Sequence, residues 1–313
     1  MDNLILVATQ VAILFALMGV GAACRWRKLI DGASVKGIVN LLVLIVTPCL
    51  IVDCFQRPFD AGRLRGLIQA FAIALSAHLA LVAASMAAIR HREDRTRCVL
   101  RLATVFSNAG FMGIPLEHAI LGEDGVFFGV VYVVVFNVVM WSWGFCTMKG
   151  VDLRHMGREQ VRTVLVNPGT VGILLGLPLF LCSVALPTVV RTPIHGLAEL
   201  NTPLAMVVIG YYLAGAKLGP VLRTPPAYLA GAIRLVVYPL ALTAVLYPFR
   251  AHLDRTMMLA LVTAASAPVA AMVSMFASMF DRDVDMSVGL VSGTTLLSIV
   301  TMPPVIALAM SVL

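Results

Sequence analysis

Asn108-Ala109-Gly110-Phe111-Met112-Gly113-Ile114-Pro115-Leu116 lies in the middle of a hydrophobic segment that is long enough to cross a bilayer. The stretch combines glycines, a proline and an asparagine, residue types that interrupt a helix. In lipid, the backbone groups freed by an interruption must be buried by protein or line a watery cavity. A second such segment, Ser266-Ala267-Pro268, follows in the C-terminal half. Paired interruptions in two halves are typical of transporter binding sites.

The composition excludes a soluble protein. Of 313 residues, 60% are hydrophobic and only 12% are charged, against about 25% charged in soluble domains. The net charge of +7 does not indicate a nucleic-acid partner, because the basic residues lie in short loops between apolar runs. The six cysteines show no metal-ligand spacing, so neither a metal nor a cofactor is expected. The first apolar segment follows Asp2 and is interpreted as a retained helix in the lipid bilayer.

The hydropathy pattern predicts an all-α polytopic membrane protein, since about 20 apolar residues cross the bilayer core. Ten spans are expected, at 4–23, 37–55, 66–89, 99–121, 125–147, 167–187, 196–216, 226–248, 256–280 and 285–312. An even number of spans places both termini on one side. Most basic residues lie in the loops of the other side, so the positive-inside rule predicts non-cytoplasmic termini in a multi-pass protein of the cell (inner) membrane.

The chain also shows traces of an internal repeat. A polar connecting loop at 148–166 separates residues 1–147 from residues 167–313, with five spans in each half. Thr47-Pro48 in the second span is echoed by Thr202-Pro203 in the seventh, and Pro115 is echoed by Pro268 at nearly the same offset. An odd number of spans per half gives the halves opposite orientations in the membrane. The sequence therefore predicts two inverted five-helix repeats.

The stretch from Asn108 to Leu116 resembles the fourth-helix signature of the auxin efflux carrier family. That family includes the plant PIN-type carriers and bacterial proteins labelled malonate or malate permeases. The resemblance covers nearly the whole chain and the short connecting loop is similar to that of the bacterial members. Four further stretches fit in the right order: Asn167-Pro168, Thr202 to Met206, Arg234 with Tyr238-Pro239, and Ser292 to Pro303.

The resemblance implies a fold similar to that of the bile acid–sodium symporters. Helices 1, 2, 6 and 7 would form a scaffold, and helices 3–5 and 8–10 a mobile transport domain. The broken helices 4 and 9 would cross within that domain. The resemblance also implies a homodimer and an elevator-type alternating-access motion.

The interruptions themselves predict an anion site. New half-helix starts near Gly113 to Leu116 and near Pro268 to Ala271 would present unpaired N–H groups at a positive dipole end. Two such ends suit a carboxylate; the alternative is that the prolines only kink the helices for packing. The predicted substrate-binding residues are Ser107, Asn108, Ala109, Gly110, Gly113, Ile114, Pro115, Asn137, Ser266, Ala267 and Pro268, with Thr47, Pro48, Thr202 and Pro203 on the scaffold face.

Three polar residues within or beside the spans have two readings each. Asn137 lies in strongly apolar sequence and is either a substrate contact or an interhelical hydrogen-bonding group. Arg234 lies well inside a span, so it either attracts the anion or extends its side chain to the interface. Glu117 is the candidate for proton coupling, and the alternative is a solvated outer rim. A proton is favoured over sodium because no set of carboxylates suggests a sodium site.

These features favour a secondary transporter of a small organic anion such as malonate or malate. An exporter of an auxin-like aromatic monocarboxylate is the alternative, since Phe111, Met112 and Met206 would suit either pocket. An intramembrane enzyme would need a nucleophile–base pair or a metal cluster, and no such motif occurs in the sequence. A receptor or channel would not need paired interruptions in inverted halves.

Overall fold

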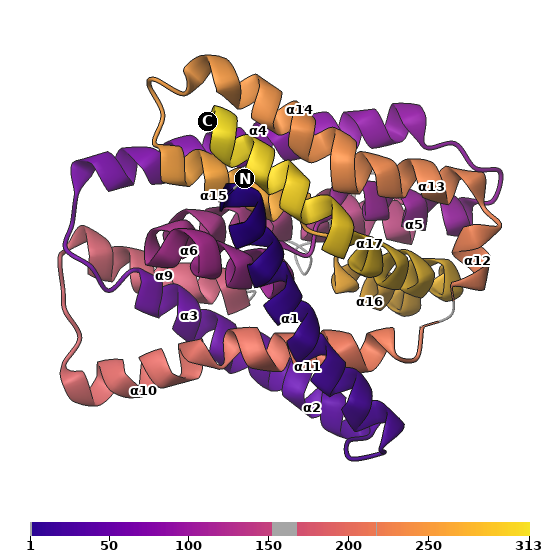
Figure 1. The fold of residues 1–313 in the computed structure, drawn as a ribbon, viewed down its shortest axis with the longest axis horizontal. Helices are drawn as coiled ribbons and strands as arrows, with labels where there is room; N and C mark the ends of the chain where they lie inside the picture. Colours follow the sequence, from indigo (N-terminus) through magenta and orange to yellow (C-terminus); the bar gives the residue numbers. More distant parts are fainter. Residues whose placement is uncertain (1, 152–167, 217) are drawn as a thin grey trace.

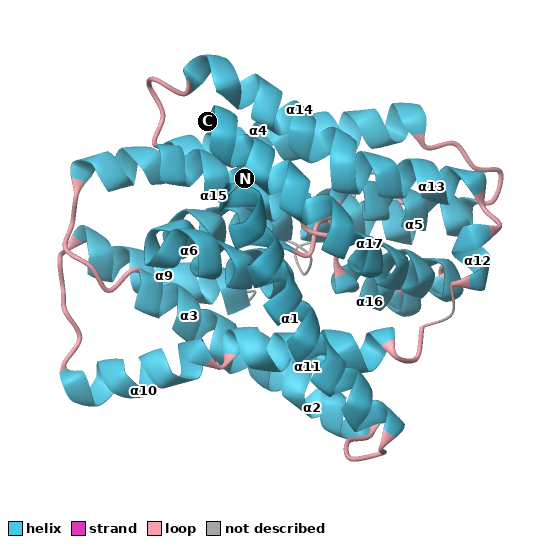
Figure 2. Ribbon diagram, in the orientation of Figure 1, coloured by secondary structure: helices cyan, strands magenta, loops and turns pink. Residues whose placement is uncertain are grey.

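The computed structural model describes residues 2–151, 168–216 and 218–313, so the predicted loop at 148–166 lies mostly outside the described residues. The described part of the chain is helical, with no strand (Figure 2). Within it, six helical stretches are long and apolar enough to cross a membrane. These are the features of a multi-pass membrane protein.

The N-terminal half contains long helices and short stretches of π-helix between them. They are α1 (Asp2–Trp26), α2 (Gly32–Leu41), η1 (Leu42–Val46), α3 (Thr47–Cys54), α4 (Ala61–Ala88), α5 (Asp94–Val105), η2 (Ala109–Gly113), α6 (Ile114–Val139), η3 (Met140–Gly144) and α7 (Phe145–Lys149).

The C-terminal half has a similar make-up. Its elements are α9 (Pro168–Leu181), α10 (Thr188–Glu199), α11 (Asn201–Leu213), α12 (Gly219–Leu222), α13 (Pro225–Ala232), η5 (Ile233–Val237), α14 (Tyr238–Leu246), η6 (Tyr247–Phe249), α15 (Arg255–Ser266), α16 (Ala271–Met279) and α17 (Val284–Val312). α17 packs against α1, and the two chain ends lie close together in the view of Figure 1.

Three prolines inside long helices each follow a π-helical turn. Pro48, Pro115 and Pro239 are the second residues of α3, α6 and α14, directly after η1, η2 and η5. A proline has no N–H, and its ring clashes with the carbonyl four residues earlier in a regular α-helix. The wider π turn gives the ring room, so these helices continue past their prolines.

Glycines allow two pairs of helices to pack closely. A Cβ at Gly21 of α1 would overlap with the carbonyl oxygen of Val207 on α11, and a Cβ at Gly210 of α11 would overlap with the carbonyl oxygen of Met18. The two helices cross in the lower part of Figure 1. Gly172 of α9 leaves room for the side chain of Ile51 on α3. Small residues at such crossings are typical of helix packing in membranes.

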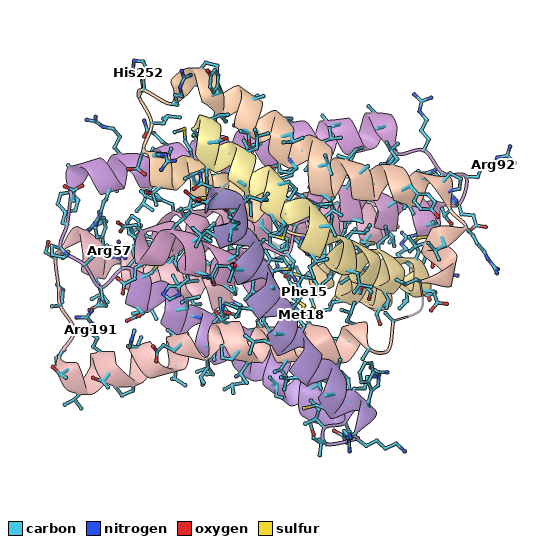
Figure 3. The ribbon with its side chains drawn as sticks, viewed as in Figure 1. Phe15, Met18, Arg57, Arg92, Arg191 and His252 are labelled. Atoms are coloured by element: carbon cyan, nitrogen blue, oxygen red, sulfur yellow. The ribbon has the colours of Figure 1, made fainter. Side chains whose placement is uncertain are left out.

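Two apolar clusters fill the interior. The larger cluster lies mainly among α4 to α7 and α13 to α17. The smaller cluster joins α1, η1, α11 and α17 to three residues beside the interruptions, Met112, Leu116 and Ala267. Met18 of α1 belongs to the smaller cluster and lies near the centre of the view in Figure 3. The interruptions therefore lie where the two clusters meet.

Candidate functional site

The first interruption separates α5 from η2. α5 ends at Val105, and the helix resumes at Ala109. Between them the backbone is not helical, with φ −100° and ψ 111° at Phe106 and ψ 51° at Asn108. The sequence predicted a longer interruption, through to Leu116. The helix restarts earlier because the π turn η2 accommodates Pro115.

The second interruption separates α15 from α16. α15 ends at Ser266 and α16 begins at Ala271. Ala267 and Ala270 are extended, with ψ 148° and ψ 135°. A residue before proline is disfavoured in the helical region, and proline itself cannot donate a helical hydrogen bond. Pro268 therefore ends α15 in two ways: it disfavours a helical conformation at Ala267, and it lacks the N–H needed to continue the helix.

The two interruptions hydrogen-bond to each other through their backbones. The N–H of Asn108 donates to the carbonyl oxygen of Pro268 at 2.7 Å, and the N–H of Ala270 donates to that of Phe106 at 2.9 Å. A single antiparallel β-bridge lies between these bonds. We call this pairing of residues 106–108 with residues 267–270 the crossover. It satisfies buried backbone groups that both helices give up when they break.

Four helix ends meet at the crossover: α5 and α15 end there, and η2 and α16 begin there. The first N–H groups of a helix carry partial positive charge and the last carbonyls partial negative charge. The crossover thus combines two positive and two negative ends. No group of three or more metal-ligating side chains lies within the described residues, so the helix ends and nearby polar side chains are the features that a ligand would meet.

Arg234 covers the two negative ends. Its side chain is completely buried, and Nη1 donates to the carbonyl oxygen of Val105 at 2.9 Å. Nη2 donates to the carbonyl oxygen of Ala265. These two carbonyls belong to the last turns of α5 and α15. The guanidinium also lies over the ring of Tyr238, 4.7 Å from its centroid.

A chain of buried hydroxyl groups leads away from the crossover. The hydroxyl of Ser107 lies 3.4 Å from the phenol oxygen of Tyr132, which lies 3.4 Å from that of Tyr238. The ring of His78 packs against Tyr132, with 4.7 Å between the centroids. Its Nδ1 is hydrogen-bonded to the carbonyl oxygen of Ala74 on its own helix at 2.8 Å. Ser107, Tyr132, Tyr238 and Arg234 thus form a buried polar group, and all four lie on helices predicted from the sequence to belong to the transport domain.

The sequence matches a family model described as membrane transport protein over residues 6–306. The match extends over nearly the whole chain. This chain belongs to the auxin efflux carrier family. The resemblance drawn from residues 108–116 is confirmed, and the carrier is a membrane transporter. No curated protein matches it.

Most of the predicted substrate-binding residues of the carrier lie at the crossover or in the turns beside it. These residues are buried, apart from a half-buried Gly110. This group comprises Ser107, Asn108, Ala109, Gly110, Gly113, Ile114, Pro115, Ser266, Ala267 and Pro268. The crossover is closed to solvent in this conformation.

The remaining predicted residues lie elsewhere. Asn137 is half-buried and donates from Nδ2 to the carbonyl oxygen of Val133, one turn earlier in its own helix, at 2.9 Å. Thr47 donates to the carbonyl of Leu42 at 2.9 Å in the same manner. Thr47-Pro48 opens α3 and Thr202-Pro203 lies in the first turn of α11. α3 contacts α10, and α11 contacts η1, the turn before α3.

Glu117 is completely buried, and neither carboxyl oxygen has a hydrogen-bond partner within the described residues. A solvated rim, the alternative considered for this residue, is therefore wrong. The acidic residues that follow do lie on a rim. Asp124 pairs with Arg57, and Arg57 also lies 3.7 Å from Glu123; Arg57 is at the left edge of the view in Figure 3.

Sequence reasoning missed Thr294 as part of the site. Its Oγ1 accepts a hydrogen bond from the N–H of Val269 at 3.1 Å, which satisfies a backbone donor inside the second interruption. Tyr132 was missed as well. A signal was present in the sequence, because a threonine or tyrosine in an apolar helix requires a hydrogen-bond partner, but the partner could not be named without the fold.

Proposed function

We propose that this carrier is a secondary active transporter of a small organic anion, with malonate or malate as the expected type, and not an enzyme. One observation carries the proposal. Arg234 is bonded to the two negative helix ends, α5 and α15, and the two positive ends, η2 and α16, begin at the same crossover. Such a combination favours a carboxylate.

We assign ten spans to the chain. The six long apolar stretches account for seven of them, because the stretch Ala109–Lys149 turns at Gly122, where φ is 69°, and then continues as the fifth span. The other three are α9, α11 with the last turn of α10, and α15 with α16. The first half of the fourth span is α5.

The helix pairs support two inverted repeats, residues 1–147 and 167–313. Span one (α1) pairs with span seven (α11), and span two (α3) pairs with span six (α9). In two five-span repeats, span one corresponds to span six and span two to span seven. The pair of spans one and seven is therefore equivalent to the pair of spans six and two. In our proposal these four spans form the scaffold. The remaining six form a transport domain that moves past them, with the smaller apolar cluster as the contact surface.

Location and assembly remain proposals of the same kind. The distribution of basic residues supports non-cytoplasmic termini in an inner membrane. The homodimer rests on the family resemblance alone. Cross-linking in membranes and accessibility labelling of single cysteines at both termini test these two points independently of transport.

Uptake into proteoliposomes tests the function. The purified carrier is reconstituted, and entry of labelled malonate, malate and indole-3-acetate is compared with entry into protein-free vesicles. Saturable uptake of a dicarboxylate, inhibited by its unlabelled form, is the expected result. Preference for indole-3-acetate would select the aromatic alternative. Absence of saturable uptake for every anion in the panel contradicts the proposed function.

A further inference from the structure

The most unusual polar group outside the crossover is the carboxyl group of Glu117. It lies in the first turn of α6, and its side chain is completely buried. Both carboxyl oxygens lack a hydrogen-bond partner within the described residues. Buried polar groups in proteins almost always have partners, so an orphaned carboxyl group calls for an explanation.

Glycines form the surroundings of this carboxyl group. A Cβ at Gly129 would overlap with Oε2, so the carboxyl group occupies the space that a side chain would fill there. A Cβ at Gly113 would lie 3.6 Å from Oε1. The chain turns at Gly122, which has a left-handed φ of 69°, and this turn returns Gly129 to the side of Glu117. The pocket is therefore built by one helix folded back on itself.

Within the described residues, no charged or acid–base group compensates the carboxyl group. The elements packed against α6 are η2, η3, α1, α3, α4, α9, α11 and α15. None of their charged or acid–base side chains, nor those of α6 itself, makes a hydrogen bond or ion pair with Glu117 in the described structure. Cysteines apart, these groups are Asp2, Arg25, Asp53, Arg63, Arg65, His78, His118, Glu123, Asp124, Tyr132, Tyr211, Tyr212 and Arg255.

Several of these groups are engaged elsewhere. His78 is hydrogen-bonded within its own helix, Arg63 pairs with Asp124, and Arg255 donates to the carbonyl oxygen of Met310. An ionised carboxylate in such surroundings would be both desolvated and unpaired, which is strongly unfavourable. A bound metal cation would need several oxygen ligands, and no group of three or more metal-ligating side chains lies together in the described residues. A proton is the ligand that fits.

We propose that Glu117 is a proton-binding site of the transport domain, and that its proton is taken up and released together with the transported anion. This inference rests on the proposed function. Glu117 lies eight residues after the start of η2 at Ala109, a distance of about 12 Å along a helix. At an effective dielectric constant of about 20, a negative charge at that distance weakens the binding of an anion roughly tenfold. Protonation of Glu117 therefore favours anion binding at the crossover.

Infrared difference spectroscopy tests the proton site without any transport. At neutral pH the wild-type carrier is expected to show the C=O stretching band of a protonated carboxylic acid, and this band is absent from Glu117→Gln. The control is Glu123→Gln on the same helix, whose side chain is exposed and whose substitution leaves the band unchanged. Identical spectra of wild type and Glu117→Gln across the pH range would overturn the proposal.

A second variant covers the case in which Glu117→Gln does not fold. Gly129→Ala keeps the carboxyl group but fills its pocket, so the band should shift or disappear. An unchanged band would contradict the placement of the proton.

Transport assays then test coupling. Glu117→Gln should retain exchange of labelled for unlabelled anion to within about threefold, because its amide mimics the protonated acid, and should lose accumulation driven by a proton gradient. Gradient-driven accumulation at the wild-type level in this variant would exclude the coupling role. If the wild type shows the infrared band yet transports no anion of the panel, the proposed function fails and the proton site stands.

Discussion

The backbone N–H of Asn108 lies 2.7 Å from the carbonyl oxygen of Pro268, and this hydrogen bond joins the two halves of the chain at the point where both helices break. Its partner bond runs from Ala270 to Phe106. Both bonds use main-chain atoms only. The structural role of these residues can therefore be separated from any role of their side chains.

Asn108→Ala should abolish anion uptake and leave folding intact. The substitution removes the side-chain amide but keeps the N–H that donates to Pro268. Uptake into proteoliposomes is measured alongside the thermal unfolding of the detergent-solubilised variant. Unchanged uptake would remove the Asn108 side chain from the substrate site.

Ala270→Pro should destabilise the crossover. Ala270 has φ −64°, which proline adopts without strain, so the main change is loss of the N–H that donates to Phe106. An orphaned buried carbonyl costs about 1–3 kcal/mol. The unfolding midpoint in detergent should fall accordingly, while Ala270→Ser, which retains the N–H, should match the wild type. Equal stability of the proline variant would show that this bond contributes nothing measurable.

Arg234→Met should lower stability further, because two helix-end carbonyls lose their donor at once. Each is expected to cost about 1–3 kcal/mol. Arg234→Lys supplies one compact charge instead of a planar fork, so an intermediate stability is expected. Arg250→Met serves as the control, since Arg250 is exposed and donates to the carbonyl oxygen of Tyr247, three residues earlier. The measurement is the midpoint temperature of thermal unfolding of the three variants. If this midpoint is no lower for Arg234→Met than for Arg250→Met, the guanidinium does not stabilise the crossover.

Thr294→Val should be more harmful than Thr295→Val. The first substitution removes the acceptor for the N–H of Val269, at a cost of about 1–3 kcal/mol. The hydroxyl of Thr295 bonds only to the carbonyl of Val291 in its own helix. Thr294→Ser keeps an acceptor and should restore most of the stability. Equal unfolding midpoints for the two valine variants would rule out this contribution of Thr294.

A pH-dependent contact is expected at the surface, where Asp53 lies near the end of the second span and His195 lies just before the seventh span predicted from the sequence. His195 lies 2.9 Å from Asp53, and the hydrogen bond and charge of that carboxylate raise the pKa of the imidazole above its usual value. A raised pKa in the folded state means that the contribution is complete below about pH 6.5 and is lost as the pH rises through the folded-state pKa. Because His195 is about half exposed, the effect is small. Comparing Asp53→Asn with wild type at acidic and alkaline pH should show a stability difference only on the acidic side.

The interruptions could be located from the sequence because they depend on local residue types. Pro268 cannot continue a helix, and Gly110 and Gly113 weaken the helix beside the first interruption. The exact restart at Ala109 could not be predicted, since it depends on a π turn that makes room for Pro115. The partner of each broken end is likewise a matter of tertiary structure: Thr294 meets Val269 only in the folded chain.

Buried charges were the hardest to interpret from sequence. Arg234 was visible as a charge within a span, but its contacts with Val105 and Ala265 join three separate helices. Its predicted attraction of an anion stays a prediction. For Glu117, a solvated rim remained as the alternative to proton coupling, because acidic residues follow it in the sequence. The turn at Gly122 and the missing side chain of Gly129 bury it instead.

The backbone bonding of the crossover also affects how such a protein can change over generations. Every amino acid except proline supplies the N–H that Asn108 and Ala270 donate. Side chains at the crossover can therefore be substituted without loss of the backbone hydrogen bonds that join the two halves. The substrate specificity of such a carrier can therefore change during evolution while its fold is kept.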